Sequence, residues 1–305
     1  MTEPIDVAVI GAGAAGLSAA VTLSRFRRSV VVVDDGAPRN ATAGHVHNFL
    51  TRDGTPPSEL LRIGRAEVER YGGRLVDGRV RGVSGGLGAF SVDLGDGRPI
   101  TAGRVVVATG GRDELPDLPG VAARWGRDVL HCPFCHGWEV RDRRIGVLAT
   151  GPLAGHQATL FRLLSPHVTV LAHTAPPDAD GAAGLTRRGI DVVDGVVRGL
   201  VVRDDRLVGV ELGDGTVVAL DALVVATTVR SRSDFLAPLG LHPTELRVGD
   251  QVVATRIETG PNGATPVPGV WVAGNAADPM AQVVSSAAAG LATGAAVVAD
   301  LLAAS

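Results

Sequence analysis

The only two cysteines of this 305-residue chain lie three positions apart in the segment HCPFCHG. Cys132 and Cys135 can close and reopen a disulfide at the start of a helix, and the helix terminus would stabilise a thiolate. Cys-x-x-Cys-His is also the pattern of haem attachment, and two cysteines beside two histidines could supply part of a zinc site. Haem attachment usually follows export, and structural zinc usually draws on a second pair of ligands, which this chain lacks. The segment therefore favours a redox dithiol, with haem and zinc as weaker alternatives and no metal expected.

Histidine stands on either side of the cysteine pair, at His131 and His136. Thiol–disulfide exchange moves protons as well as electrons, and an imidazole titrates near neutral pH. Both histidines are therefore candidate general bases. For each, the alternative is a histidine that only hydrogen-bonds the backbone.

Two stretches of the chain alternate apolar runs with helical segments, IDVAVIG to SVVVVDD from residue 5 and RRIGVLATG to HVTVLAH from about residue 144. Apolar runs without period-two alternation indicate strands buried on both faces, and their alternation with helices indicates parallel βαβ units. We expect an α/β protein with two Rossmann-like, three-layer nucleotide-binding domains, the second inserted into the first. The predicted domains are 1–115 with 237–305, and 116–236. Hairpin patterns at 74–101 and 191–220 predict a small antiparallel side sheet on each.

A glycine-rich loop, GAGAAG, follows the first predicted strand and opens a helix. Its first glycine permits a tight turn, its second lets a pyrophosphate approach the backbone, and its third lets helix and strand pack closely. The helix terminus then faces the phosphates. Asp34, or Asp35 in its place, ends the next strand, where a carboxylate can accept hydrogen bonds from a ribose. The loop residues predicted to bind a dinucleotide are Gly11, Gly13, Ala14, Ala15 and Gly16.

Five motifs in sequence order resemble the low-molecular-weight thioredoxin reductases: VIGAGAAGLSAA, DDGAPRN, VVVATGG, CPFCHG and GVWVAGNAADPMAQ. The resemblance covers nearly the whole chain and implies FAD in the first domain and a homodimer. One position departs from the family pattern, because Asn275 replaces the usual aspartate, although an amide can still accept a hydrogen bond from a ribityl hydroxyl. The further FAD contacts implied are Arg39, Asn40, Ala108, Thr109, Gly110, Gly274, Asn275, Gln282 and Val283.

The resemblance also implies roles around the redox pair. Cys135 would face the flavin, and Cys132 would exchange with the substrate, either a small-molecule dithiol or a thioredoxin-like protein. His136 stands where the family commonly carries an acid, which ranks it above His131 as the base. His45 and His47 are weaker candidates near the flavin.

The second glycine loop is degraded. Only Gly151 remains where the family has three glycines, and the side chains of Ala149 and Thr150 would hinder a pyrophosphate. The basic cluster that the family places after the next strand is replaced by His173 followed by TAPPD, so no arginine remains for a 2′-phosphate. These losses argue against NADPH and, less strongly, against NADH.

The degraded loop together with CPFCHG looks like the dithiol oxidases that close disulfides in gliotoxin- and holomycin-type small molecules. We therefore predict a flavin-dependent thiol–disulfide oxidoreductase that oxidises a dithiol, with O2 as acceptor. The alternatives are a disulfide reductase fed by a nicotinamide or by ferredoxin, and a catalytically idle FAD-binding redox sensor.

The composition excludes some partners. The formal net charge is −3, with 29 basic and 32 acidic residues and no long basic run, which predicts neither nucleic acid nor an anionic membrane surface as a partner. The first residues do not read as a signal peptide, and the apolar stretches, including the Ala-rich C-terminal segment, look too short or too interrupted to cross a bilayer. We expect a cytoplasmic protein.

Overall fold

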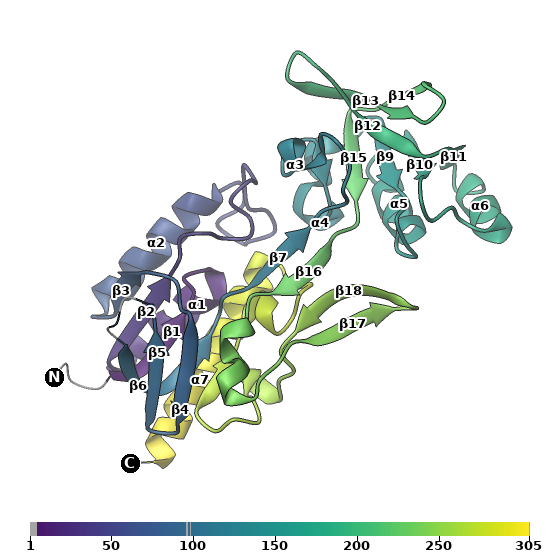
Figure 1. The fold of residues 1–305 in the computed structure, drawn as a ribbon. Helices are drawn as coiled ribbons and strands as arrows, with labels where there is room; N and C mark the ends of the chain where they lie inside the picture. Colours follow the sequence, from purple (N-terminus) through teal and green to yellow (C-terminus); the bar gives the residue numbers. More distant parts are fainter. Residues whose placement is uncertain (1–4, 96, 98, 305) are drawn as a thin grey trace.

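The chain folds into two lobes joined by two strands (Figure 1). The structure is a computed structural model that describes residues 5–95, 97 and 99–304. It confirms the predicted α/β class with two Rossmann-like units.

The first lobe is built on a sheet of seven strands in the order β3-β2-β1-β6-β5-β4, with β19 also paired to β6. The pairs among β1, β2, β3, β6 and β19 are parallel, and β4 and β5 continue the sheet as an antiparallel hairpin beyond β6. The predicted hairpin region therefore contributes one parallel strand as well as a hairpin. The strands are β1 Ile5–Ile10, β2 Val30–Asp34, β3 Arg74–Asp77, β4 Gly82–Gly86, β5 Ala89–Asp93, β6 Ile100–Val107 and β19 Val270–Val272.

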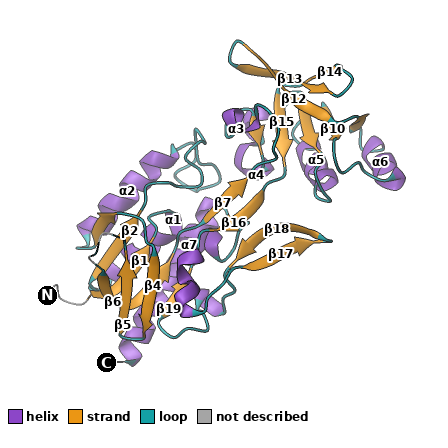
Figure 2. Ribbon diagram, in the orientation of Figure 1, coloured by secondary structure: helices purple, strands orange, loops and turns teal. Residues whose placement is uncertain are grey.

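Helices cover one face of this sheet (Figure 2). Alternate strand residues such as Val7, Val9 and Val32 pack with Leu17 of α1 and Val297 of α7, whereas their neighbours form a second core on the opposite face. Both faces are thus buried, as the apolar runs predicted. The helical elements of this lobe are α1 Ala14–Arg25, α2 Pro57–Arg70, α7 Val283–Ala303, η2 Asp234–Leu239, η3 Pro261–Gly263 and η4 Gly274–Ala276.

The second lobe repeats the plan with a sheet in the order β11-β10-β9-β15-β8 and a separate antiparallel sheet β12-β13-β14. Its strands are β8 Val129–Leu130, β9 Ile145–Leu148, β10 Val168–Ala172, β11 Asp191–Asp194, β12 Val197–Arg203, β13 Arg206–Leu212, β14 Val217–Ala219 and β15 Ala222–Val225. Its helices are α3 Val121–Arg124, α4 Pro133–His136, η1 Trp138–Val140, α5 Ala154–Arg162 and α6 Ala179–Thr186.

A four-stranded sheet in the order β17-β18-β16-β7 connects the lobes. The two crossover strands, β7 Gly111–Glu114 and β16 Thr228–Ser231, pair antiparallel, and the hairpin of β17 Thr244–Val248 and β18 Gln251–Arg256 joins them through β16. The predicted domain boundaries fall just after β7 and within η2 and stay predictions. No pattern in the sequence predicted this connecting sheet.

The C-terminal helix α7 corrects one expectation. This helix has 21 residues, and an 18-residue window of it has a mean hydropathy of 1.6, so it is long and apolar enough to cross a bilayer by length and composition. The prediction that this segment is too short or interrupted is therefore wrong, because its small polar residues neither break the helix nor lower its hydropathy enough. Core helices of soluble proteins meet the same criterion. Here Gly290 and Gly294 let α7 pack closely on α1: a Cβ on Gly290 would lie 2.0 Å from the Ala15 carbonyl oxygen.

Candidate active site

A cavity of about 860 Å³ lies between the two lobes and brings both predicted chemical motifs together. The glycine loop and the C-terminal segment line it from the first lobe, and the cysteine helix lines it from the second. Among the predicted site residues, Gly16 and the weaker candidates His45 and His47 do not line it. The others all do: Gly11, Gly13, Ala14, Ala15, Asp34, Asp35, Arg39, Asn40, Ala108, Thr109, Gly110, His131, Cys132, Cys135, His136, Gly274, Asn275, Gln282 and Val283.

The glycine loop is shaped to receive an anionic group. A Cβ on Gly16 would lie 1.8 Å from the Gly11 carbonyl oxygen, so the third glycine is needed where helix meets loop. A Cβ on Gly13 would meet nothing within 4 Å, so the backbone there borders open space. No side chain caps α1, whose first N–H groups are left for a ligand at the cavity wall. These features fit the diphosphate of FAD.

Asp34 is held in place at the end of β2. Its Oδ1 accepts a hydrogen bond of 2.9 Å from the Ala12 backbone N–H, and its Oδ2 pairs with Arg65 of α2. The carboxylate therefore braces the glycine loop while it borders the cavity, and its role as a ribose ligand stays a prediction. Arg65 could not be predicted from the sequence, because nothing in a helix pattern indicates which strand end an arginine will reach.

The C-terminal segment is fixed by Asn275. Its Nδ2 donates to the carbonyl oxygens of Asp278, Pro279 and Ala281 at 3.0, 3.3 and 2.8 Å. All three bonds use the amide nitrogen, so the amide oxygen can still accept from a hydroxyl. The substitution of asparagine for aspartate thus supplies a loop brace that a carboxylate cannot provide.

The two cysteines are free thiols whose sulfur atoms lie 2.7 Å apart at the start of α4. The Cys135 thiol donates to Cys132 Sγ, and this hydrogen bond is the largest cause that lowers the pKa of Cys132. The backbone N–H groups of residues 134 and 135 and the positive charge of Arg39 lower it further. Burial raises it, and the net pKa of Cys132 is about 7. The same bond and burial raise the pKa of Cys135 well above its usual range. In the reduced pair Cys132 is therefore the more acidic of the two thiols, and its role as the thiol that exchanges with substrate stays a prediction.

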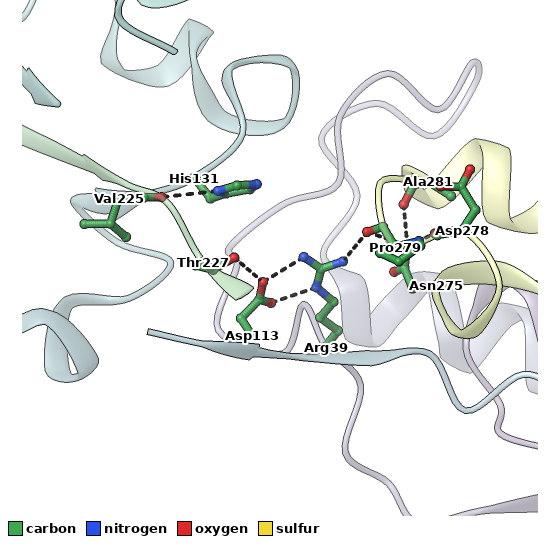
Figure 3. A network of polar contacts seen from close by, with 9 residues as sticks. All are labelled: Arg39, Asp113, His131, Val225, Thr227, Asn275, Asp278, Pro279 and Ala281. Carbon is green, nitrogen blue, oxygen red and sulfur yellow. Dashed lines mark hydrogen bonds and ion pairs between the residues drawn. The ribbon is translucent and has the colours of Figure 1, made fainter. Parts of the chain in front are cut away.

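His131 is oriented by the backbone. Its Nδ1 lies 3.2 Å from the carbonyl oxygen of Val225, which can only accept, so Nδ1 carries the proton and Nε2 is free to act as a base (Figure 3). Burial lowers the pKa of His131, and burial also lowers the pKa of His136 despite the opposing charge of Glu139. Both imidazoles are thus held neutral near pH 7. Because one nitrogen of His131 is already committed, its tautomer is the better defined of the two.

No sequence pattern predicts the ion pair between the partly buried Arg39 and the buried Asp113 (Figure 3). Arg39 Nε and Nη2 each donate to a carboxylate oxygen of Asp113 at 2.7 Å, and Thr227 Oγ1 donates to the same carboxylate at 2.8 Å. Arg39 Nη1 donates to the Pro279 carbonyl oxygen at 3.0 Å. Burial raises the pKa of Asp113, but the Arg39 hydrogen bonds and charge outweigh it and leave that pKa lowered. Arg39, predicted as an FAD contact, thus links both crossover regions to the C-terminal segment at the cavity wall.

His45 and His47 do not line the cavity. His47 Nδ1 lies 3.4 Å from Asp53, and its Nε2 lies 3.3 Å from Glu139, just beyond the cysteine helix. Nearby, Asn48 Nδ2 donates to the Phe134 carbonyl oxygen at 2.6 Å. This loop of the first lobe therefore rests on the cysteine helix of the second. In the part of the chain that the structure describes, no three histidine, cysteine or acidic residues are grouped to hold a metal.

The degraded second loop lies between β9 and α5 and does not line the cavity. His173, which stands where the family carries its basic cluster, accepts a hydrogen bond at Nδ1 from the Val197 N–H at 3.1 Å. It braces the start of β12.

A redox-active cysteine pair and a dinucleotide loop that face one cavity in a two-lobed α/β fold define a flavin-dependent thiol–disulfide oxidoreductase. The chain belongs to the pyridine nucleotide-disulphide oxidoreductase family, which it matches over residues 5–293. Membership of this family implies FAD.

Relatives and solved structures agree with this assignment. The chain is 33% identical to "Thioredoxin reductase sirT" of Leptosphaeria maculans, over 95% of this chain and 92% of that protein. It is also 33% identical to "Thioredoxin reductase aclD" of Aspergillus oryzae, over 90% of each. Among solved structures, HlmI is 47% identical with a TM-score of 0.91, covering 99% of this chain and 94% of the other. An oxidoreductase from Agrobacterium tumefaciens is 36% identical with a TM-score of 0.91, covering 99% and 100%.

Proposed function

We propose that this enzyme oxidises a dithiol to a disulfide through Cys132 and Cys135, with FAD as the internal electron acceptor and O2 as the terminal one. One observation carries the proposal. The cysteine pair shares a cavity with the first glycine loop, whereas the second loop lies outside it, has a single glycine and has no cation to hold a 2′-phosphate. Electrons from a dithiol have a direct route to a bound flavin, and electrons from a nicotinamide have no competent binding loop.

The exchange balances two electrons and two protons. A substrate thiolate attacks Cys132 Sγ of the oxidised pair, which breaks the Cys132–Cys135 bond and leaves Cys135 as a thiolate. The second substrate thiol loses its proton and attacks the mixed disulfide, which releases the substrate disulfide and reduces the pair. Bound FAD would supply the two-electron acceptor that reoxidises the pair, and O2 would finally take those two electrons with the two protons of the substrate thiols to give hydrogen peroxide.

Residues around the cysteine pair can accept protons, and they favour ionisation of Cys132. His131 lines the cavity and its Nε2 is unprotonated, so it can take the proton of a substrate thiol. We therefore place His131 alongside His136 as a base, although the family resemblance ranks His136 first. The low pKa of Cys132 makes it a good leaving thiolate when the mixed disulfide is resolved.

Two exposed aromatic side chains, one in the cysteine helix and one in η1, lie outside the cavity lining and suit a small apolar substrate. Phe134, between the two cysteines, is 59% exposed, and Trp138, one turn later, is 65% exposed. Exposed aromatic groups beside a reactive pair can bind an apolar dithiol without a large protein interface. A thioredoxin-like protein is the other candidate substrate.

The test is an anaerobic stopped-flow measurement of flavin bleaching. The oxidised enzyme is mixed with dithiothreitol, NADPH or NADH. We expect fast bleaching by dithiothreitol and slow or no bleaching by either nicotinamide. The Cys135→Ser variant should keep its flavin and lose the response to dithiothreitol.

The alternatives have their own signatures in the same experiment. The names of the relatives favour a thioredoxin reductase as the second candidate, and rapid bleaching by NADPH would establish it in place of an oxidase. A flavin that no reductant bleaches would point to an idle redox sensor.

We also propose a cytoplasmic homodimer. A cysteine pair that must be both reduced and oxidised in turnover suits a reducing compartment. Exposed apolar residues on α7, including Val284 and Leu291, offer a surface for a second copy. Sedimentation of the purified enzyme at the mass of one chain would contradict the dimer.

A further inference from the structure

The β17–β18 hairpin of the connecting sheet reaches from the first lobe to the second (Figure 1). Its strands pair up to Val248 and Gln251, and Gly249 turns the chain between them in a left-handed conformation, with φ of +58°. Arg247 Nη1 donates to the Asp250 carbonyl oxygen at 2.7 Å, which braces this tip. The hairpin therefore presents the Gln251 side chain from a fixed support.

Gln251 packs directly on the degraded nucleotide loop. A Cβ built on Gly151 would lie 1.7 Å from Gln251 Oε1, 2.6 Å from its Cδ and 2.9 Å from its Nε2. The amide thus fills the space in front of the one glycine left in that loop. This is the position at the end of β9, ahead of α5, that a dinucleotide pyrophosphate needs to approach. A phosphate could occupy it only by displacing Gln251.

A second contact between the lobes lies at the cysteine helix. Asn48 Nδ2 donates to the Phe134 carbonyl oxygen at 2.6 Å, and His47 faces Glu139 at 3.3 Å. The first lobe thus contacts the inserted lobe at the cysteine helix and at the loop 149–153, and Thr42 also lies against Gly126. Several separate contacts fix the orientation of the inserted lobe more firmly than one.

We propose that Gln251 is a positioning residue: the hairpin tip clamps the degraded nucleotide loop and so holds Cys132 and Cys135 toward the flavin pocket. The same side chain excludes a dinucleotide phosphate from Gly151. This inference rests on the proposed function, because it takes the loop at 149–153 to hold no nicotinamide dinucleotide during turnover.

The test compares four variants: Gly151→Leu, Gln251→Gly, the double variant, and Gly155→Leu as a matched control. A leucine at 151 needs the space that the Gln251 amide fills, and removal of that amide returns the space. A Cβ on Gly155, in the first turn of α5, meets nothing within 4 Å, so the control adds the same bulk without touching the hairpin. The measurements are the anaerobic rate of flavin bleaching by dithiothreitol, the radius of gyration from small-angle X-ray scattering, and the melting temperature.

We expect Gly151→Leu to slow bleaching about tenfold and to raise the radius of gyration, because the lobes leave the productive orientation. The double variant should recover most of the rate, and Gly155→Leu should match wild type. Equal rates and radii for Gly151→Leu and wild type, or no rescue in the double variant, would overturn the clamp. A fall in melting temperature without a change in rate would mean that the contact is only structural.

Two further outcomes keep the test decisive. If Gly151→Leu does not fold, Gln251→Gly alone is expected to slow bleaching about threefold, and an unchanged rate and radius would refute the clamp. If dithiothreitol does not bleach the wild-type flavin, the proposed function fails. The radii of gyration of the variants then show separately whether Gln251 holds the lobes in their orientation.

Discussion

Replacing Cys135 with alanine removes the thiol that donates to Cys132 Sγ, the largest cause of the low pKa of Cys132. Without it, the pKa of Cys132 should rise from about 7 toward the ordinary value of 9.0. At pH 7 the ionised fraction of the thiol then falls from roughly one half to about 1%. The loss of thiolate alone would slow attack on a disulfide about 50-fold.

A second effect opposes this loss. A more basic thiolate is intrinsically more nucleophilic, by about eightfold over two pKa units for a Brønsted coefficient of about 0.45. We therefore expect Cys135→Ala to react about sixfold more slowly than wild type at pH 7 and about sevenfold faster at pH 10. The pH profiles of the two proteins should cross at about pH 8. The backbone N–H groups at residues 134 and 135 remain in the variant, so these are upper values.

The assay is the initial rate of thiopyridone release from dithiodipyridine by the reduced protein, measured across this pH range. Cys135→Ser is the control, because a serine hydroxyl can still donate to the Cys132 sulfur and should keep the profile close to wild type. Superimposable profiles for wild type and Cys135→Ala would refute the reasoning. So would a variant that is slower at every pH, since that would indicate damage to the site in place of a pKa change.

Three further predictions concern the glycine loop, the Arg39–Asp113 ion pair and the cysteine helix. Gly16→Ala should lower both the stability of the apo-protein and the affinity for FAD, because its Cβ would collide with a loop carbonyl. Gly13→Ala should leave the melting temperature of the apo-protein unchanged and weaken only flavin binding, measured by fluorescence titration. Asp113→Asn should destabilise the fold by about 2 kcal/mol at pH 7, or about 4 °C in melting temperature, because it breaks a buried pair with Arg39. Because the pKa of Asp113 is lower in the folded state, its contribution to stability is present above about pH 4 and is lost as the pH falls through the folded pKa. The melting temperatures of wild type and Asp113→Asn should therefore converge in acid. A difference in melting temperature that stays constant with pH would contradict this. Phe134→Ala should raise KM for an apolar dithiol about tenfold with little change for dithiothreitol, and an equal effect on both would argue against an apolar subsite.

The motifs that could be read from the sequence are those whose chemistry is local. The glycine loop, the Cys-x-x-Cys pair and the degraded loop around Gly151 each depend on residue types at short spacing, and a strand–turn–helix pattern fixes where such residues lie. The parallel sheets could be predicted for the same reason, because strands buried on both faces leave continuous apolar runs. The family resemblance then supplied FAD and the roles of the two thiols.

Only the tertiary structure decided which distant groups meet. Arg39 finds Asp113 on a crossover strand, Asp34 finds Arg65 on a helix, and Gln251 finds Gly151 in the other lobe. No local pattern encodes such pairs, because each partner is selected by the packing of whole elements. The same holds for the thiols: spacing brings Cys132 and Cys135 together, but burial, hydrogen bonding and the nearby guanidinium determine which of the two carries the negative charge.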